Sequence, residues 1–400
     1  MAPPRKIENL PIVQPVDVGC DESVKPELRE ELNHGGVPMA DRTNELDKCQ
    51  SMIPLMAQPA IYRILDANLD RAREGLRIIE EWCRFGLNHS KMANECKHLR
   101  QELGSWHSSD LRAARNTPQD PGTSLTHPSE EKRLGISQLL QANFSRVQEA
   151  LRVLEEYGKL YHRDMGGSIK KMRYRVYTLE TNLLAYQRYR QLVKSRLYLV
   201  TSATENIFAI VEAALLGGLS LVQYRDKYSP DGERIRIAKK LRQICHQYSA
   251  LFIMNDRVDI AVAVDADGVH LGQQDLPIAV ARQLLGPGRI IGRSTSNPQE
   301  MEEAIAQGAD YIGVGPVYET PTKPGKTAAG LEYVRYAAEN ATIPWFAIGG
   351  IDMNNLNDVL DARAERVAVV RAIMEAEQPT LLTQYFISQL TRIQTLRSHE

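Results

Sequence analysis

The most constraining feature of this sequence is an alternation of two patterns from residue 196 to the C-terminus. Eight short apolar runs are separated by stretches in which apolar residues recur at helical spacing. Continuous apolar runs are typical of strands buried on both faces. Alternating strands and helices imply a parallel sheet with right-handed crossovers. The expected strands are 196–202, 219–226, 251–256, 268–272, 290–295, 311–317, 345–350 and 366–372.

The stretches between these strands predict helices at 206–217, 231–247, 258–263, 277–285, 298–307, 330–338 and 354–361, with a last helix at 379–391. Eight strand–helix units within 196–400 predict an α/β fold, a compact (β/α)8 TIM barrel near the lower size limit for that fold. A doubly wound open sheet is the alternative. The count of eight favours the barrel.

The preceding segment, 59–195, has helical periodicity and an internal repeat. Residues 67–81 recur at 142–156 with Ala-Asn, Arg, Glu, Leu-Arg and Glu-Glu in the same places. Two helical hairpins related by duplication, packed as a four-helix bundle, fit this pattern best. Arg77 and Glu81 are spaced to pair along a helix. We interpret the repeated charges as a ladder of ion pairs at the seam between the repeats, the alternative being an anion site of converging arginines.

Composition excludes several classes of protein. The charges nearly cancel, with 49 Lys and Arg against 50 Asp and Glu, so no overall basic field exists for nucleic-acid binding. Five scattered Cys without a C-x-x-C motif argue against disulfides and thiolate zinc sites. No apolar stretch approaches the length of a membrane span. Residues 1–58 are interrupted by Pro and Gly and are expected to be a disordered tail, and the protein is expected to be cytoplasmic.

Polar residues follow the second expected strand. In TIM barrels the active site forms where the strands end. Gln223, Arg225 and Lys227 alternate along an extended segment and therefore point the same way. Two cations and an amide on one side suit a diphosphate. The alternative interpretation is an ordinary solvated strand end.

Two carboxylates end the next two strands. Asp256 follows Asn255 after the third strand, and Asp275 follows the fourth. Mg2+ typically takes one or two carboxylates, while waters and substrate phosphates complete its shell. Beside the basic strand end, the pair predicts a metal–diphosphate site. For either Asp alone, a helix N-cap is the alternative.

A second anion site is predicted at the last three strands. A long loop of Gly, Pro, Thr and Lys, 313–325, follows strand six, the pair Gly349–Gly350 follows strand seven, and Val370 and Arg371 follow strand eight. Loops after strands seven and eight form the usual phosphate site of these barrels. Two phosphorylated substrates in one pocket indicate transfer of a group with release of pyrophosphate.

The motifs over about 196–390 resemble thiamine-phosphate synthase. They are VQYRDK at 222–227, NDR at 255–257, ADGVHLGQ at 266–273, YIGVGPV at 311–317, TPTK at 320–323 and AIGGI at 347–351. The resemblance implies a transferase of thiamine biosynthesis. It would join 4-amino-5-hydroxymethyl-2-methylpyrimidine diphosphate to 4-methyl-5-(2-phosphoethyl)thiazole, and pyrophosphate would leave first.

The same resemblance implies roles for individual residues. Those implied to hold the pyrimidine diphosphate are Gln223, Arg225, Lys227, Asn255, Ser294 and Lys323. Asp256 and Asp275 would bind Mg2+. Those implied to hold the thiazole phosphate are Thr320, Thr322, Gly350, Val370 and Arg371.

Two positions depart from the family pattern. Family members often have His where this chain has Ser296, and Ser where it has Arg371. A related barrel, the thiazole tautomerase, uses a His near the first position, so Ser296 argues against that activity. A noncatalytic sensor of thiamine phosphates is the competing class, and the Asp256–Asp275 pair argues against it.

The helical segment is similar to a domain sometimes fused to this synthase. Three hypotheses stay open for it: a second catalytic or pyrimidine-binding module, an oligomerisation element, or a scaffold for other pathway enzymes. The expected partners are two small phosphorylated substrates, with neither nucleic acid nor membrane, and a homo-oligomer is left open.

Overall fold

The computed structural model describes residues 57–120, 135–320, 325 and 327–397. The predicted tail, 1–58, lies outside the described residues except for its last two. The chain forms two compact units, one ending at Glu180 and the other beginning at Thr181. None of the helices described reaches the length and apolarity needed to cross a membrane.

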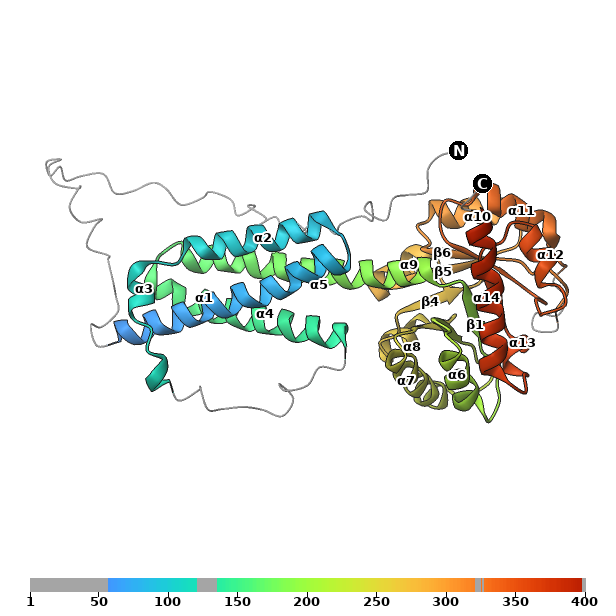
Figure 1. Cartoon of the computed structure of the whole chain (residues 1–400), viewed down its shortest axis with the longest axis horizontal. Helices are drawn as coiled ribbons and strands as arrows, with labels where there is room; N and C mark the ends of the chain where they lie inside the picture. Colours follow the sequence, from blue (N-terminus) through green and yellow to red (C-terminus); the bar gives the residue numbers. More distant parts are fainter. Residues whose placement is uncertain (1–56, 121–134, 321–324, 326, 398–400) are drawn as a thin grey trace, which may run out of the picture. The chain divides into compact units, whose positions relative to one another are not determined.

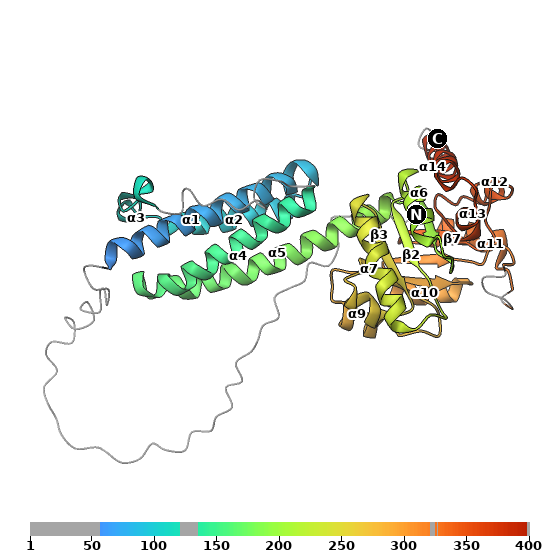
Figure 2. The same ribbon diagram turned by 90° about the horizontal axis from the view of Figure 1, so that it is seen from below.

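The first unit is helical. Its elements are α1 (Gln58–Glu81), a π-helical turn (Trp82–Gly86), α2 (Ser90–Ser105), α3 (Ser109–Ala113), a 3-10 turn (Thr117–Gln119), α4 (Ile136–Tyr161) and the first part of α5 (Met165–Lys194). Helix α1 packs most extensively against α4, and α1 and α2 form a hairpin. In both views α1, α2, α4 and α5 run side by side (Figures 1 and 2). The bundle predicted from the repeat is confirmed.

The duplicated charges form matching ion pairs. In the first hairpin, the buried Glu80 carboxylate accepts from Arg100 Nη1 at 2.6 Å. In the second, the buried Glu155 carboxylate accepts from Arg173 Nε at 2.8 Å. A buried carboxylate is tolerated when a cation and hydrogen bonds compensate its lost hydration. The repeated charges thus form ion pairs at equivalent places, but each pair lies within one hairpin and not at the predicted seam between the repeats.

Helix α1 lies close against α4 at a glycine. A Cβ atom on Gly75 would lie 2.6 Å from Val147 Cγ2 and 3.2 Å from the Asn143 carbonyl oxygen. Such distances are shorter than carbon atoms tolerate without displacement. The two repeated helices can therefore cross at this distance only because Gly75 has no side chain.

The second unit contains a closed barrel of eight parallel strands. The strands are β1 (Leu197–Val200), β2 (Leu221–Tyr224), β3 (Leu251–Asn255), β4 (Gly268–Leu271), β5 (Ile290–Thr295), β6 (Tyr311–Val314), β7 (Trp345–Ile348) and β8 (Val367–Val369). Each strand pairs with the next along the chain, and β8 pairs with β1 in parallel. The predicted TIM barrel is confirmed, and the open-sheet alternative is wrong.

Helices cover the outside of the barrel (Figures 1 and 2). They are α6 (Ile207–Leu216), α7 (Asp231–Gln247), α8 (Val258–Ala263), α9 (Ile278–Leu285), α10 (Pro298–Ala306), α11 (Gly330–Asn340), α12 (Leu356–Asp361), α13 (Arg371–Met374) and α14 (Pro379–Arg397). One apolar core fills the space between strands and helices. A second core lies inside the barrel, where Tyr198, Tyr311 and Phe346 are buried among aliphatic side chains.

The last turns of α5 belong to the barrel unit. Leu192 is fully buried in the interior core with Tyr198 and Tyr311. Arg188 Nε donates to the buried Asp267 carboxylate at 3.0 Å. The compact barrel unit therefore includes residues of α5 that precede the first strand.

Candidate active site

Two cavities adjoin at the ends of the barrel strands. The larger, of about 260 Å³, is lined mainly by residues that follow β6, β7 and β8. The smaller, of about 100 Å³, is lined mainly by residues of β1 to β5 and the loops after β2 to β4. They share Ser294, Gly313, Ile348, Ala368 and Val370. Two ligands bound in them would therefore lie in contact with each other.

The smaller cavity brings together residues predicted to bind the pyrimidine diphosphate and the two carboxylates predicted to bind Mg2+. It is lined by Gln223, Arg225, Lys227, Asn255, Asp256, Asp275 and Ser294. Lys227 Nζ lies 3.3 Å from Asp256 Oδ2, and the lysine side chain is about half exposed. Of the predicted set for this substrate, only Lys323 lies outside the described residues.

Asp256 and Asp275 lie next to each other, not at helix N-caps. Burial and the neighbouring Asp275 carboxylate raise the pKa of Asp256, which indicates two like charges held close together. The N-caps of the following helices are Arg257 and Pro277, so the capping alternative is wrong for both carboxylates. Asp275 Oδ2 instead accepts from the Gly272 N–H at 2.6 Å.

This carboxylate pair fits a hard divalent cation. A cation between the two groups would relieve their repulsion, and oxygen ligands are what Mg2+ prefers. Within the described ranges no cluster of three or more His, Cys, Asp or Glu side chains could hold a metal. A cation here would therefore depend on water and on the substrate to complete its coordination.

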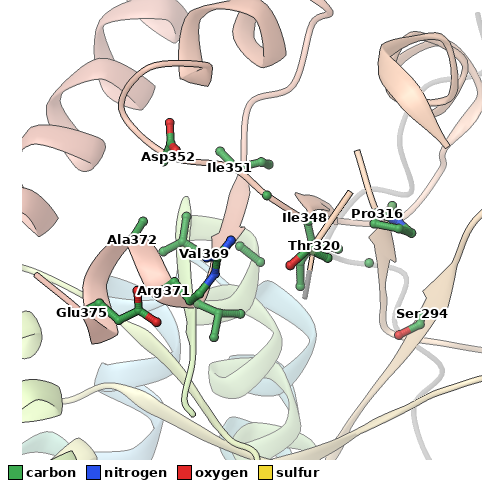
Figure 3. A pocket seen from close by; sticks show the side chains of 16 residues that line it. Ser294, Pro316, Thr320, Ile348, Ile351, Asp352, Val369, Arg371, Ala372 and Glu375 are labelled. Carbon is green, nitrogen blue, oxygen red and sulfur yellow. The ribbon is translucent and has the colours of Figure 1, made fainter. Parts of the chain in front are cut away.

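The larger cavity contains the residues predicted for the thiazole phosphate. Thr320, Gly350, Val370 and Arg371 all line it. Figure 3 shows Arg371 beside Val369, with Thr320 and Ser294 farther along the same cavity. Thr322, also predicted here, lies outside the described residues.

Glycine is required at Gly350. Its φ is +66°, and a Cβ atom there would lie 2.9 Å from Tyr318 Cβ. The backbone therefore turns sharply beside the cavity with no side chain between it and a ligand, as a phosphate loop requires. Asn355 Nδ2 fixes this turn by donating to the Gly350 carbonyl at 2.7 Å.

Ser296 lies away from both cavities. Its hydroxyl donates to Glu300 Oε2 at 2.9 Å, and its N–H donates to the same oxygen at 2.7 Å. Its polar atoms are thus used in holding the start of α10. The position at which the tautomerase has His is occupied here by a residue with a local structural role.

Three polar residues of the smaller cavity were missed by the sequence interpretation. Tyr198, His270 and Tyr311 line it from β1, β4 and β6. Tyr198 and Tyr311 hydroxyls lie 2.7 Å apart, and the Tyr311 hydroxyl lies 3.0 Å from His270 Nδ1. The only feature of the sequence that could have indicated these residues was a polar side chain at a strand position facing the barrel interior. Such residues also occur as ordinary core side chains.

Both units of the chain have known relatives. Residues 197–373 match the family model described as thiamine monophosphate synthase, and residues 63–182 match the ThiD2 family. A thiamine-phosphate synthase of Nostoc sp. is 71% identical over 336 residues, which is 84% of this chain and 96% of that protein. One from Nostoc punctiforme is 69% identical over the same shares of each chain.

One solved structure is similar to half of the chain. Thiamine phosphate pyrophosphorylase from Pyrococcus furiosus is 40% identical, with a TM-score of 0.47, and covers 50% of this chain and 98% of its own. The two Nostoc relatives, by contrast, align over more residues than the barrel contains, so they share helical sequence as well. On the identity and coverage of these relatives, the chain belongs to the thiamine-phosphate synthase family of enzymes.

Proposed function

We propose that this chain condenses 4-amino-5-hydroxymethyl-2-methylpyrimidine diphosphate with 4-methyl-5-(2-phosphoethyl)thiazole, giving thiamine phosphate and pyrophosphate. The observation that carries the proposal is the pair of adjoining cavities with shared walls. One has the cations and carboxylates suited to a metal-bound diphosphate. The other has the glycine turn and hydroxyl suited to a monophosphate.

The proposed reaction is dissociative. The bond between the pyrimidine methylene carbon and the diphosphate oxygen breaks, and its electron pair leaves with pyrophosphate. The electron-rich aminopyrimidine stabilises the resulting methylene cation, and the thiazole nitrogen then forms the new C–N bond. Such a route requires positioning and charge stabilisation, and it requires neither a protein nucleophile nor a strong base.

The chain's own residues have distinct tasks in this route. Arg225 and Lys227 bind the diphosphate oxygens, and Ser294 donates a hydrogen bond to the leaving group. Asp256 and Asp275 would hold Mg2+, which would supply positive charge to neutralise the departing pyrophosphate. Phe346 and Ile348 form an apolar wall that keeps water from the reactive carbon.

The metal assignment is tested by Asp256→Asn. Asp256 has a φ of +60°, a conformation that Asn also tolerates, so the variant is expected to fold. Removing one carboxylate should lower turnover by about 100-fold or more and raise the Mg2+ concentration needed for half-maximal rate. The measurement is pyrophosphate release from both substrates across a Mg2+ titration.

Asp259→Asn is the matched control. Asp259 is an exposed carboxylate three residues along, paired with Arg257 and outside both cavities. It should release pyrophosphate at the wild-type rate. Unchanged turnover of Asp256→Asn at every Mg2+ concentration would refute the metal site. If the wild-type protein bound both substrates but released no pyrophosphate, the noncatalytic sensor of thiamine phosphates would be favoured instead.

A further inference from the structure

An unbroken chain of hydrogen bonds crosses the floor of the smaller cavity. Gln223 Nε2 lies 2.6 Å from the Tyr198 hydroxyl, which lies 2.7 Å from the Tyr311 hydroxyl. The Tyr311 hydroxyl lies 3.0 Å from His270 Nδ1, and His270 Nε2 lies 2.9 Å from Ser294 Oγ. The chain thus links five residues on strands β2, β1, β6, β4 and β5. Its two ends, Gln223 and Ser294, are two of the residues predicted to hold the pyrimidine diphosphate.

The hydroxyl and imidazole contacts admit either direction, and we assign the one in which every proton has an acceptor within the hydrogen-bond chain. The Gln223 amide donates to Tyr198, so the single Tyr198 proton is directed to Tyr311. The single Tyr311 proton is then directed to His270 Nδ1, which must accept. A neutral imidazole that accepts at Nδ1 carries its proton on Nε2, and that proton is donated to Ser294 Oγ.

This direction determines where the Ser294 hydroxyl points its proton. Because the Ser294 oxygen accepts from His270, its own proton is directed elsewhere. Ser294 lines both cavities, so the proton is available to a ligand there. With the opposite histidine tautomer, Ser294 would donate to His270 and present lone pairs to an anion. The direction of the chain therefore decides whether Ser294 attracts or repels a diphosphate.

Burial keeps the two tyrosine hydroxyls of the hydrogen-bond chain protonated. Tyr198 is 2% exposed and Tyr311 is fully buried, and burial raises the pKa of both hydroxyls, so both keep their protons. The Tyr311 ring stacks edge-to-face against Tyr198 and Phe346. It occupies space left free at Gly292, where a Cβ atom would overlap the ring. The rings are thus fixed by contacts that do not involve their hydroxyls.

We propose that Tyr198, Tyr311 and His270 are positioning residues that orient the Ser294 hydroxyl as a donor to the leaving pyrophosphate. The proposal rests on the proposed function, because it requires Ser294 to contact that group. A donor oriented before the reaction stabilises developing negative charge without reorganisation, and this is a large part of electrostatic catalysis.

The test is a double-mutant cycle with Tyr311→Phe and Ser294→Ala, measured as pyrophosphate release. Tyr311→Phe keeps the ring contacts and should lower kcat on the order of tenfold, with little change in KM for the pyrimidine diphosphate. Ser294→Ala should lower kcat by at least as much. The double variant should match Ser294→Ala, since Tyr311 acts only through that hydroxyl.

Tyr333→Phe is the matched control. The Tyr333 hydroxyl donates to Thr295 Oγ1 at 2.7 Å, and both residues are buried. The variant thus loses a buried hydrogen bond between two hydroxyls, one of which belongs to the residue next to Ser294. Neither hydroxyl is part of the hydrogen-bond chain from Gln223 to Ser294. It should keep the wild-type kcat. Thermal unfolding of both Phe variants shows whether their stabilities are comparable.

A spectroscopic measurement supplies an independent readout. The 15N shifts of the His270 ring should report a proton on Nε2 in the full chain, and a mixture of tautomers in Tyr311→Phe. A ring that is protonated on Nδ1 in the wild-type protein would overturn the proposed direction.

The kinetic outcomes separate the two proposals. Wild-type kcat in Ser294→Ala would remove Ser294 from the proposed reaction. If Ser294→Ala lowered kcat while Tyr311→Phe kept the wild-type kcat, the proposed reaction would stand and the positioning role of the hydrogen-bond chain would be overturned. The positioning role would also be overturned if the kcat loss of the double variant equalled the product of the two single losses. A kcat loss in Tyr333→Phe as large as that in Tyr311→Phe would overturn it too.

Discussion

Arg371 and Glu375 place opposite charges beside the same cavity. Both line the larger cavity, one at the start of α13 and one just after its end (Figure 3). A cation at this place attracts a phosphate, and a carboxylate repels it. Arg371→Ser should therefore raise KM for the thiazole phosphate several-fold, while kcat changes little. Steady-state kinetics with the thiazole phosphate varied measures this.

Glu375→Gln is the control, because it removes a negative charge and should change KM in the opposite direction. It should lower the same KM, and both effects should shrink as salt is added, because exposed charges are screened. A KM that is unaffected by Arg371→Ser at low salt would show that the guanidinium does not reach the phosphate. The backbone at Val370 and Gly350 would then hold that group alone.

Many of the candidate site residues could be predicted from their local position in the sequence. Gln223, Arg225 and Lys227 could be found because polar residues directly after an apolar run have few structural reasons to be there. Tyr198 and Tyr311 could not, because a tyrosine inside a strand looks like ordinary core. Only closure of the barrel brings their hydroxyls together across 113 residues of sequence.

At the scale of elements, the crossing of α1 and α4 depends on Gly75. Gly75→Ala improves helix propensity but places a methyl group against Val147. Overpacking of this kind costs about 1–3 kcal/mol. We expect a lower midpoint for the unfolding of the helical unit, measured by urea titration of the full chain with far-UV circular dichroism.

Two further variants test the cause. Val147→Ala combined with Gly75→Ala should recover part of the loss, because it removes the contacting methyl groups. Gly104→Ala in α2, where the nearest atom to the new Cβ would lie 3.9 Å away, should be neutral or stabilising. Equal destabilisation by Gly75→Ala and Gly104→Ala would argue against a steric cause.

The repeat predicted the paired helices but not all their detail. Residues 67–81 and 142–156 both lie in long α-helices, as expected. The π-helical turn at Trp82–Gly86 follows only the first copy, and the equivalent residues of the second continue α4. A local change in hydrogen-bond spacing alters few apolar positions, so periodicity does not indicate it.

At the scale of the whole molecule, the barrel needs residues that precede its first strand. A fragment of residues 196–400 lacks Leu192, which is buried inside the barrel, and Arg188, which neutralises Asp267. Loss of a buried Leu side chain alone costs roughly 2–5 kcal/mol. A fragment of residues 181–400 should therefore have a Tm several degrees higher than one of residues 196–400.

Pyrophosphate release by the longer fragment then separates the roles of the two units. Activity equal to that of the full chain would place the chemistry wholly in the barrel. Leu192→Ala in the full chain is the control for the stability effect, since it removes the buried side chain without shortening the protein. Equal Tm values for the two fragments would contradict the assignment of α5 to the barrel.

The closed ring of strands has a further consequence for the folding chain. The hydrogen bonds that direct the Ser294 proton pass through strands β1, β2, β4, β5 and β6, and β1 is held in the ring on one side by β8, the last strand to be synthesised. A barrel in which β8 has not yet joined β1 leaves the strand that carries Tyr198 unsupported on one side, so it should lack the full contribution of these hydrogen bonds. In a refolding experiment, the last increase in kcat, on the order of tenfold, should therefore coincide with closure of the ring.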